Sequence, residues 1–258
     1  MTDAKATAEA LYKAARTRTP IPPLTEADPD MTVGDAYAVQ SALCDLLLAD
    51  GDRIVGYKLG LTSAPMQQMF GVNEPDYAPV FASGVVDDGA AVEVGRFIQL
   101  KVEAEIALML DRPLTGPGVT ALEAARAIAG ATAAIEIVDS RIEDWKIKLP
   151  DTISDLASSG AVVLSSRLVP LEDLDVRLVG MVITKNGQLM GTGAGAAALG
   201  NPIQAVAWLA NTLAPYGVTL EAGRFVMTGA LHAAFPAVPG DVVRAEFDRL
   251  GPVTVRMT

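Results

Sequence analysis

The feature that most constrains this chain is the run KVEAEI at residues 101–106, inside an apolar segment, 97–110, that we predict to be a strand. Because alternate side chains of a strand share a face, Lys101, Glu103 and Glu105 project to one side. The apolar residues between them face a core. Two carboxylates on a largely apolar strand require a cation or a shared proton. Mg²⁺ or Mn²⁺, which prefer oxygen ligands, meet that requirement. A solvated strand face, or an ion pair with Lys101, is the alternative.

Composition narrows the class of protein. With 258 residues, half of them hydrophobic, the chain forms one large domain or a large domain with a small one. A net charge of −11 argues against a nucleic-acid partner, which requires a basic surface. An anionic substrate therefore needs a local cation or a metal. The single cysteine, Cys44, and the single histidine, His232, exclude metal sites built from several of either residue.

The sequence shows neither a basic and apolar leader nor an uninterrupted apolar run of about 18 residues. We therefore expect a cytoplasmic protein with no membrane partner.

The sequence pattern of the first fifty residues predicts helices. Residues 3–17 form an amphipathic pattern, and the proline-rich segment 19–24 ends it. Thr32 and Asp35 approximate a capping box that opens a second helix, which we expect to end near residues 50–51. We interpret residues 1–52 as a helical region that packs on the remainder or on a neighbouring subunit.

Residues 53–61 read as a strand in which Lys58 lies between Gly56 and Gly60. A lysine in an apolar run is either a positioned functional cation or a surface residue whose stem alone is buried. The following loop, 71–77, carries Asp76. Loops often carry site residues, although the local sequence favours an ordinary turn carboxylate at this position.

A third carboxylate lies in a later strand. Thr120 and Glu123 form a capping box for a helix that we expect to end near Gly130, and residues 131–138 then read as a strand carrying Glu136. The strand–helix–strand order places Glu136 near the first strand. It serves either as a third metal carboxylate or as a partner for Arg141.

The remaining elements are mainly strands. We predict a strand at 161–165, a hairpin at 175–191, a helix from about 202 to 214, and strands at 224–228, 241–247 and 253–257.

Several blocks in order resemble a known family. They are residues 56–63 (GYKLGLTS), 71–77 (GVNEPDY), 103–107 (EAEIA), 135–141 (IEIVDSR), 151–155 (DTISD), 157–160 (ASSG) and 228–230 (TGA). Together they resemble the 2-keto-4-pentenoate hydratase family of aromatic meta-cleavage pathways. This family includes the similar 4-oxalocrotonate decarboxylases and belongs to the fumarylacetoacetase-like group. The resemblance extends from about residue 23 to the C-terminus.

The resemblance implies an α+β fold, with a fumarylacetoacetase-type mixed β-roll as the catalytic domain at 53–258 and the N-terminal helical region at 1–52. It also implies a homo-oligomer. The site residues it implies are Glu103, Glu105 and Glu136 as ligands of Mg²⁺ or Mn²⁺, Lys58 and Asp76 as catalytic residues, and Ser159 and Leu61 as substrate contacts.

The activity implied is metal-dependent addition of water to 2-hydroxypenta-2,4-dienoate or a substituted relative. In that reaction Lys58 orients the substrate or relays a proton, and Asp76 positions the water or takes its proton. The main alternative is 4-oxalocrotonate decarboxylation by the same metal chemistry. Tyr57, where many hydratases carry a basic residue, and the variable segment 231–235 leave substrate choice open.

Two further interpretations remain. The chain could be a non-catalytic partner of a catalytic homologue, or a C–C bond hydrolase, which requires a histidine–carboxylate pair. His232 lies either at the mouth of the site or, as we favour, in a surface or structural position. The residues around it offer no clamp for a second carboxylate, which favours the hydratase. A pathway enzyme is a candidate partner for the N-terminal helices.

Overall fold

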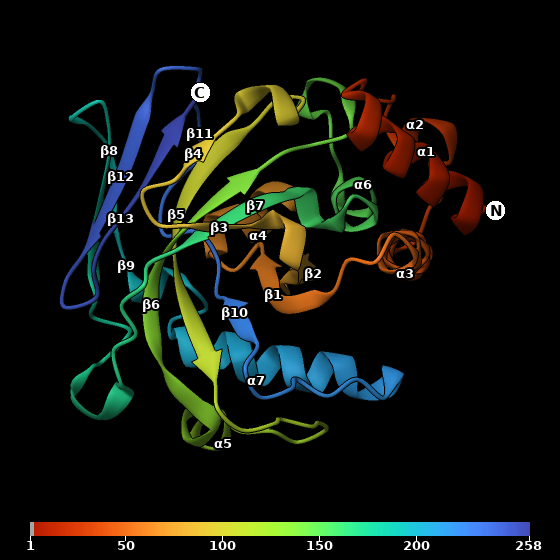
Figure 1. The fold of residues 1–258 in the computed structure, drawn as a ribbon. Coiled ribbons are helices and arrows are strands. Elements are labelled where there is room, and N and C mark those ends of the chain that lie inside the picture. Colours follow the sequence, from red (N-terminus) through yellow and green to blue (C-terminus); the bar gives the residue numbers. More distant parts are fainter. Residues whose placement is uncertain (1–2) are drawn as a thin grey trace.

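The computed structural model describes residues 3–258 (Figure 1), so residues 1–2 of the predicted N-terminal region lie outside the described residues. The helices are α1 (Ala4–Thr17), α2 (Leu24–Ala27), α3 (Val33–Ala49), α4 (Ala64–Phe70), α5 (Ala121–Ala127), α6 (Leu149–Ser154) and α7 (Pro202–Leu213). The strands are β1 (Ile54–Gly60), β2 (Asp76–Phe81), β3 (Val85–Asp87), β4 (Ala91–Val92), β5 (Lys101–Leu110), β6 (Ile128–Val138), β7 (Ser159–Leu164), β8 (Gly180–Lys185), β9 (Gln188–Ala194), β10 (Phe225–Met227), β11 (Phe235–Pro236), β12 (Val242–Phe247) and β13 (Gly251–Met257).

Two mixed sheets form the body of the protein. The larger sheet has the strand order β2-β1-β10-β5-β6-β7-β3, with β11 pairing with β5, and the smaller has the order β4-β13-β12-β8-β9. The long strands β5 and β6 curve through the molecule, and the smaller sheet covers them on one side (Figure 1). The predicted α+β fold, a mixed β-roll, is therefore confirmed.

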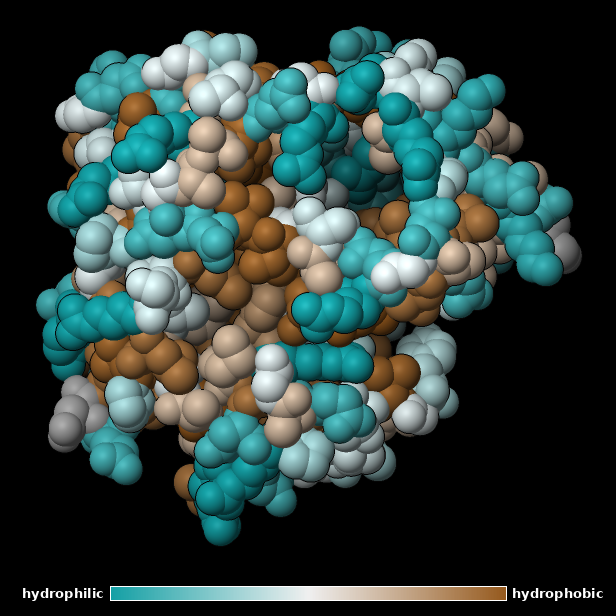
Figure 2. All heavy atoms as spheres, viewed as in Figure 1, coloured by the Kyte–Doolittle hydropathy of each residue, from teal (hydrophilic) through white to brown (hydrophobic). Residues whose placement is uncertain are grey.

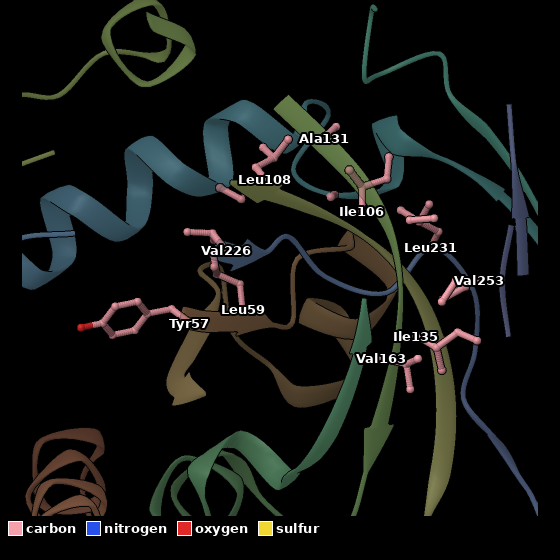
Figure 3. Close-up of a cluster of buried hydrophobic side chains, with 14 of the residues drawn as sticks. Tyr57, Leu59, Ile106, Leu108, Ala131, Ile135, Val163, Val226, Leu231 and Val253 are labelled. Carbon is pink, nitrogen blue, oxygen red and sulfur yellow. The ribbon is translucent and has the colours of Figure 1, made fainter. Parts of the chain in front are cut away.

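The interior between the sheets is apolar. Figure 3 shows side chains of β1, β5, β6 and β7 meeting in one cluster, with Val253 of β13 approaching from the second sheet. Ile106, Leu108 and Ile135 are fully buried there. Each of these side chains contributes roughly 1.5–3 kcal/mol through burial. One face of β5 is thereby anchored in the core, which leaves the face carrying Glu103 and Glu105 for the site.

The N-terminal helices pack on a second apolar cluster. Residues of α1 and α3 meet Phe81 of β2 and Ile153 of α6 there. Thr32 caps α3 with the predicted capping box to Asp35. Buried Gln40 of α3 donates from Nε2 to the carbonyl oxygens of Tyr77 (3.0 Å) and Ile153 (2.8 Å). The helices are thus bonded to the backbone next to Asp76.

Some predicted boundaries were wrong for identifiable reasons. The strand predicted from residue 97 begins at Lys101, because the N–H groups of Ile98 and Gln99 donate to the carboxylate of Asp139 instead of to a strand. Helix α5 ends at Ala127 rather than near Gly130, and β6 begins directly after it.

The outer surface is mixed in character. Figure 2 shows hydrophobic residues gathered near the middle of one face, with hydrophilic residues towards its margins. None of the helices in residues 3–258 combines the length and the apolar character that a membrane crossing requires.

Candidate metal centre and active site

The three predicted metal carboxylates meet at the centre of the larger sheet. Glu103 and Glu105 alternate along β5, and the β5–β6 register places Glu136 directly opposite Glu103. One oxygen from each of the three lies within 4.8 Å of the others. Adjacent strands bring such cross-strand neighbours close together, so the spacing follows from the register alone.

Glu105 is held by the loop after β10. The Gly229 N–H donates to its Oε2 at 2.8 Å. Gly229 has φ +108°, and a Cβ there would lie 1.8 Å from Oγ1 of Thr62. Only glycine fits this backbone conformation without strain. The TGA block therefore provides a hydrogen-bond donor that a bulkier residue would displace.

Lys58 of β1 is the cation of this cluster, with 3 % of its surface exposed. Its Nζ lies 3.0 Å from Oε1 of Glu136 and donates to the carbonyl of Ala157 at 2.7 Å. Burial alone disfavours the ammonium. The surrounding carboxylates, Glu136 foremost and then Asp76, outweigh that effect and raise the pKa of Lys58. Lys58 is therefore positively charged at neutral pH.

Asp76 begins β2, opposite Gly60 of β1. Its Oδ1 lies so close to Gly60 that a Cβ there would be 2.2 Å away. No described residue hydrogen-bonds to that buried oxygen. Burial raises the pKa of Asp76 to about 6, although Lys58 opposes the shift. Asp76 thus has the properties of a proton acceptor that works near neutral pH.

The glutamates carry more negative charge than the protein itself neutralises. Burial, followed by repulsion from Glu136, raises the pKa of Glu103 to about 7, and the same two causes raise the pKa of Glu105 well above its usual value. Glu136 is fully buried, and although the Lys58 ammonium lies 3.0 Å from its Oε1, its Oε2 has no hydrogen-bond donor among residues 3–258. An all-oxygen set with unsatisfied buried acceptors fits a hard divalent cation.

The site opens onto a cavity of about 680 Å³. Lys58 of β1, Asp76 of β2 and Glu103 of β5 line it. Its apolar walls come mainly from α4, from Val72, from the segment between β6 and α6, and from the start of α6. These walls are Met66, Met69, Phe70, Val72, Trp145, Ile147, Leu149 and Pro150. A small carboxylic acid can therefore reach the carboxylates while its carbon chain contacts apolar side chains.

The two predicted substrate contacts differ in outcome. Leu61 and Ser158 line this cavity, whereas Ser159 lines a separate cavity of about 240 Å³, and the contact of Leu61 or Ser159 with substrate stays a prediction. Residues 156–158 all have positive φ, which turns the chain immediately before β7. Sequence spacing alone does not reveal such a turn, because none of the three residues is glycine.

The geometry also decides the roles of Arg141 and His232. Arg141 pairs with Asp155 and not with Glu136. His232 has a structural contact, because its Nε2 accepts a hydrogen bond from the N–H of Ala104 at 2.8 Å. Its Nδ1 lies 2.7 Å from the carbonyl oxygen of Ala233.

A β-roll whose central strands present three glutamates to a buried lysine defines an enzyme of the fumarylacetoacetase-like class. Residues 54–258 match the family model described as fumarylacetoacetate (FAA) hydrolase C-terminal. The chain belongs to the fumarylacetoacetate hydrolase family, and within it to the group of 2-keto-4-pentenoate hydratases and 4-oxalocrotonate decarboxylases that its sequence resembles.

Relatives in this group cover almost the whole chain. The 2-hydroxyhexa-2,4-dienoate hydratase of Comamonas testosteroni is 41% identical over 250 residues, which is 96% of this chain and 95% of the relative. The 2-keto-4-pentenoate hydratase of Paraburkholderia xenovorans (strain LB400) is 43% identical over 246 residues, covering 95% and 91%. Among solved structures, 4-oxalocrotonate decarboxylase from Pseudomonas putida G7, complexed with magnesium and adipate, has a TM-score of 0.97 and 38% identity, covering 100% and 99%.

Proposed function

We propose that this protein is a divalent-metal-dependent hydratase of aromatic meta-cleavage catabolism. It adds water to 2-hydroxypenta-2,4-dienoate, or a substituted relative, and yields a 4-hydroxy-2-oxo acid. The observation that carries the proposal is a cluster of three glutamates that meets a cavity at Glu103, where the buried Lys58 and Asp76 also line it. Relatives about 43% identical that are named 2-keto-4-pentenoate hydratase support the reaction.

The residues that would hold the metal are Glu103, Glu105 and Glu136. Their clustered carboxylate oxygens, among them the unsatisfied Oε2 of Glu136, fit Mg²⁺ or Mn²⁺, and the similar decarboxylase complexed with magnesium supports this choice. When bound, the ion supplies a Lewis acid for the negative charge that develops on the 2-oxygen of the substrate.

The protein's own groups then move the protons. The dienol is first ketonised by protonation at C5, which leaves a double bond between C3 and C4. Water adds at C4, and C3 takes a proton. Lys58, a cation held by Glu136 and Ala157, orients the substrate's oxygens or relays a proton. Asp76, with a pKa of about 6 and an Oδ1 that no residue of 3–258 hydrogen-bonds, positions the attacking water or accepts its proton.

The test is an ultraviolet assay on metal-stripped protein, with Mg²⁺ or Mn²⁺ added back. Freshly made 2-hydroxypenta-2,4-dienoate should disappear only when metal is present and should give the hydrated acid. Turnover of 4-oxalocrotonate alone, with release of CO₂, would replace the hydratase by the decarboxylase. If the protein turned over neither substrate and bound no metal, both the hydratase and the decarboxylase proposals would be refuted.

Decarboxylation of 4-oxalocrotonate is the second candidate. The observation that favours it is the TM-score of 0.97 to a 4-oxalocrotonate decarboxylase over the full chain. Loss of CO₂ from this acid also places negative charge on the 2-oxygen. The same glutamates and Lys58 therefore serve either reaction, and the paired assay separates them.

We further propose a division at residue 52/53 between the N-terminal helical region and the catalytic domain, a homo-oligomeric assembly, and a cytoplasmic location. A pathway enzyme remains a candidate partner for α1 and α3. Light scattering on the purified protein measures the number of subunits. A single-chain mass would contradict the homo-oligomer.

A further inference from the structure

A turn of three residues supplies one partner of the buried Lys58. Leu156, Ala157 and Ser158 have φ values of +54°, +50° and +55°, and none of them is glycine. The left-handed conformation is unfavourable for such residues, so a run of three persists only where the surrounding structure holds it. The carbonyl of Ala157, in the middle of the turn, accepts the hydrogen bond from Nζ of Lys58 at 2.7 Å. The place of the ammonium group therefore depends on a strained turn.

One guanidinium group bonds to both ends of this turn. Nη2 of Arg141 donates to the carbonyl oxygen of Asp155, and Nη1 donates to the carbonyl oxygen of Ser159 at 2.7 Å. These two residues come directly before and directly after the three residues with positive φ. The guanidinium is planar and donates in fixed directions, so it fixes the two carbonyls relative to each other.

The carboxylate of Asp155 holds the guanidinium in this orientation. Nε of Arg141 donates to Oδ1 of Asp155, and the backbone N–H of Arg141 donates to Oδ2 at 2.9 Å. The side chains are 8 % and 0 % exposed, so neither charge can turn out into water. Desolvation of such a pair offsets much of its attraction, so a defined geometry is its main contribution.

The same residues connect the turn to the strand that carries Glu136, whose Oε1 lies 3.0 Å from Nζ of Lys58. Arg141 follows the last residue of β6, Val138, by three positions. Between them, the N–H of Asp139 donates to the carbonyl of Ser158 at 2.8 Å. The carbonyl and the carboxylate on either side of the ammonium are thus held in one bonded unit.

We infer that Arg141 and Asp155 form a positioning pair, which holds the turn 156–158 so that the carbonyl of Ala157 keeps the ammonium of Lys58 in its working place. Neither Arg141 nor Asp155 lines the cavity of about 680 Å³, so the pair acts through Lys58 and not on the substrate. The inference rests on the proposed function, because it assumes that Lys58 takes part in turnover. It holds for hydration and for decarboxylation alike.

Arg141→Lys tests the pair. This variant keeps a positive charge beside Asp155, but an ammonium group lacks the planar fork that bonds to both carbonyls. The assay uses 2-hydroxypenta-2,4-dienoate or 4-oxalocrotonate, whichever the wild type converts, with saturating Mn²⁺. We expect kcat to fall by about 10²-fold, as for other misplaced catalytic groups. KM and the affinity for Mn²⁺ should change by less than about threefold, because the cavity and the glutamates stay in place.

Substitutions in the turn separate positioning from a general loss of stability. Glycine adopts positive φ without strain and keeps the backbone carbonyl, so Ala157→Gly should relieve the defect of Arg141→Lys. We expect the double variant to recover about tenfold in kcat. Ala157→Val leaves the pair intact but places a β-branched residue at φ +50°, which strains the turn from within. It should therefore lower kcat in the otherwise unchanged protein.

The control is Arg177→Lys, the same substitution in an exposed pair with Asp175, which should leave kcat unchanged. An unchanged kcat in Arg141→Lys would overturn the inference. A defect that Ala157→Gly does not relieve would also overturn it, as would a loss of Mn²⁺ affinity as large as the loss of kcat. If Arg141→Lys does not fold, Ala157→Val decides, and a normal kcat in that variant overturns the inference. All these results leave the proposed function standing, whereas a wild type that converts neither substrate refutes both.

Discussion

Nε2 of His232 accepts a hydrogen bond from the N–H of Ala104, at a point midway between Glu103 and Glu105. The accepting nitrogen carries no proton, so Nδ1 carries it and donates to the carbonyl of Ala233. Next to Ala104, the edge of β5 that pairs with β10 and β11 has no neighbouring strand. Along this edge β10 pairs with residues 107–109 and β11 with residues 101–102. The imidazole therefore takes the place of a backbone acceptor in the sheet.

The pH dependence of stability should report this neutral histidine. Burial lowers the pKa of His232, although the bond to Ala233 opposes the shift. The pKa of histidine in the unfolded state is about 6.5. Below that pH the unfolded state binds more protons than the folded state. The stabilisation that neutral His232 gives the folded state is therefore present above that pH and is lost as the pH falls.

His232→Gln, which accepts the same bond without titrating, is the comparison. Urea unfolding from pH 8 to pH 5 should show the wild type losing stability relative to this variant below about pH 6.5. A difference between the two proteins that does not change with pH would contradict the assignment.

Metal binding should release protons. In the protein without metal, burial and repulsion from Glu136 raise the pKa of Glu103 to about 7 and raise the pKa of Glu105 well above its usual value. Protonated carboxylates must lose their protons to bind a cation. Calorimetry with Mn²⁺ in buffers of different ionisation enthalpy should therefore show more protons released at pH 6 than at pH 8.5, with weaker apparent binding at pH 6. A proton release that is zero at both values would show that the carboxylates are ionised before metal arrives.

Gly60→Ala should impair catalysis by displacing Asp76. The added Cβ would lie 2.2 Å from Oδ1 of Asp76, so the carboxylate must move. We expect kcat to fall by about 10²-fold, as for other misplaced catalytic groups. Gly95→Ala is the matched control, because a Cβ there meets no atom within 4 Å and its φ is not positive. Unchanged kcat in both variants would remove Asp76 from the mechanism.

Lys58→Met should cost both stability and activity. It leaves the buried Glu136 without its cation, which we expect to lower the free energy of unfolding of metal-stripped protein by about 3–5 kcal/mol. Loss of a group that orients substrate or relays a proton should reduce kcat by about 10²–10⁴-fold. Lys146→Met, in an exposed pair, should change stability by less than about 1 kcal/mol. Near-normal turnover by Lys58→Met would exclude Lys58 from catalysis.

The parts of the structure that were predictable depend on local rules. The two capping boxes, at Thr32 and Thr120, are present as expected. Strand alternation correctly placed Glu103 and Glu105 on one face, because that face is a property of the strand itself. That Glu136 lies directly opposite Glu103 depends on the register between two strands, which the order of elements indicates only approximately.

What local rules did not predict depends on the tertiary structure. Ser158, rather than Ser159, faces the cavity because the chain before β7 turns through positive φ values. The contact of Lys101 with Trp145 brings together a strand and a short turn that are distant in sequence. His232 reaches β5 only because β10 and β11 leave a gap along that strand.

The central claim is that one divalent ion at the three glutamates is required for turnover. The most direct measurement titrates metal-stripped protein with Mn²⁺ while following both bound ion, by electron paramagnetic resonance, and hydration of 2-hydroxypenta-2,4-dienoate. Activity should rise in step with the binding of one ion per chain, and Glu136→Gln should weaken both together. Full turnover by the stripped protein, or binding that Glu136→Gln leaves unchanged, would contradict the account.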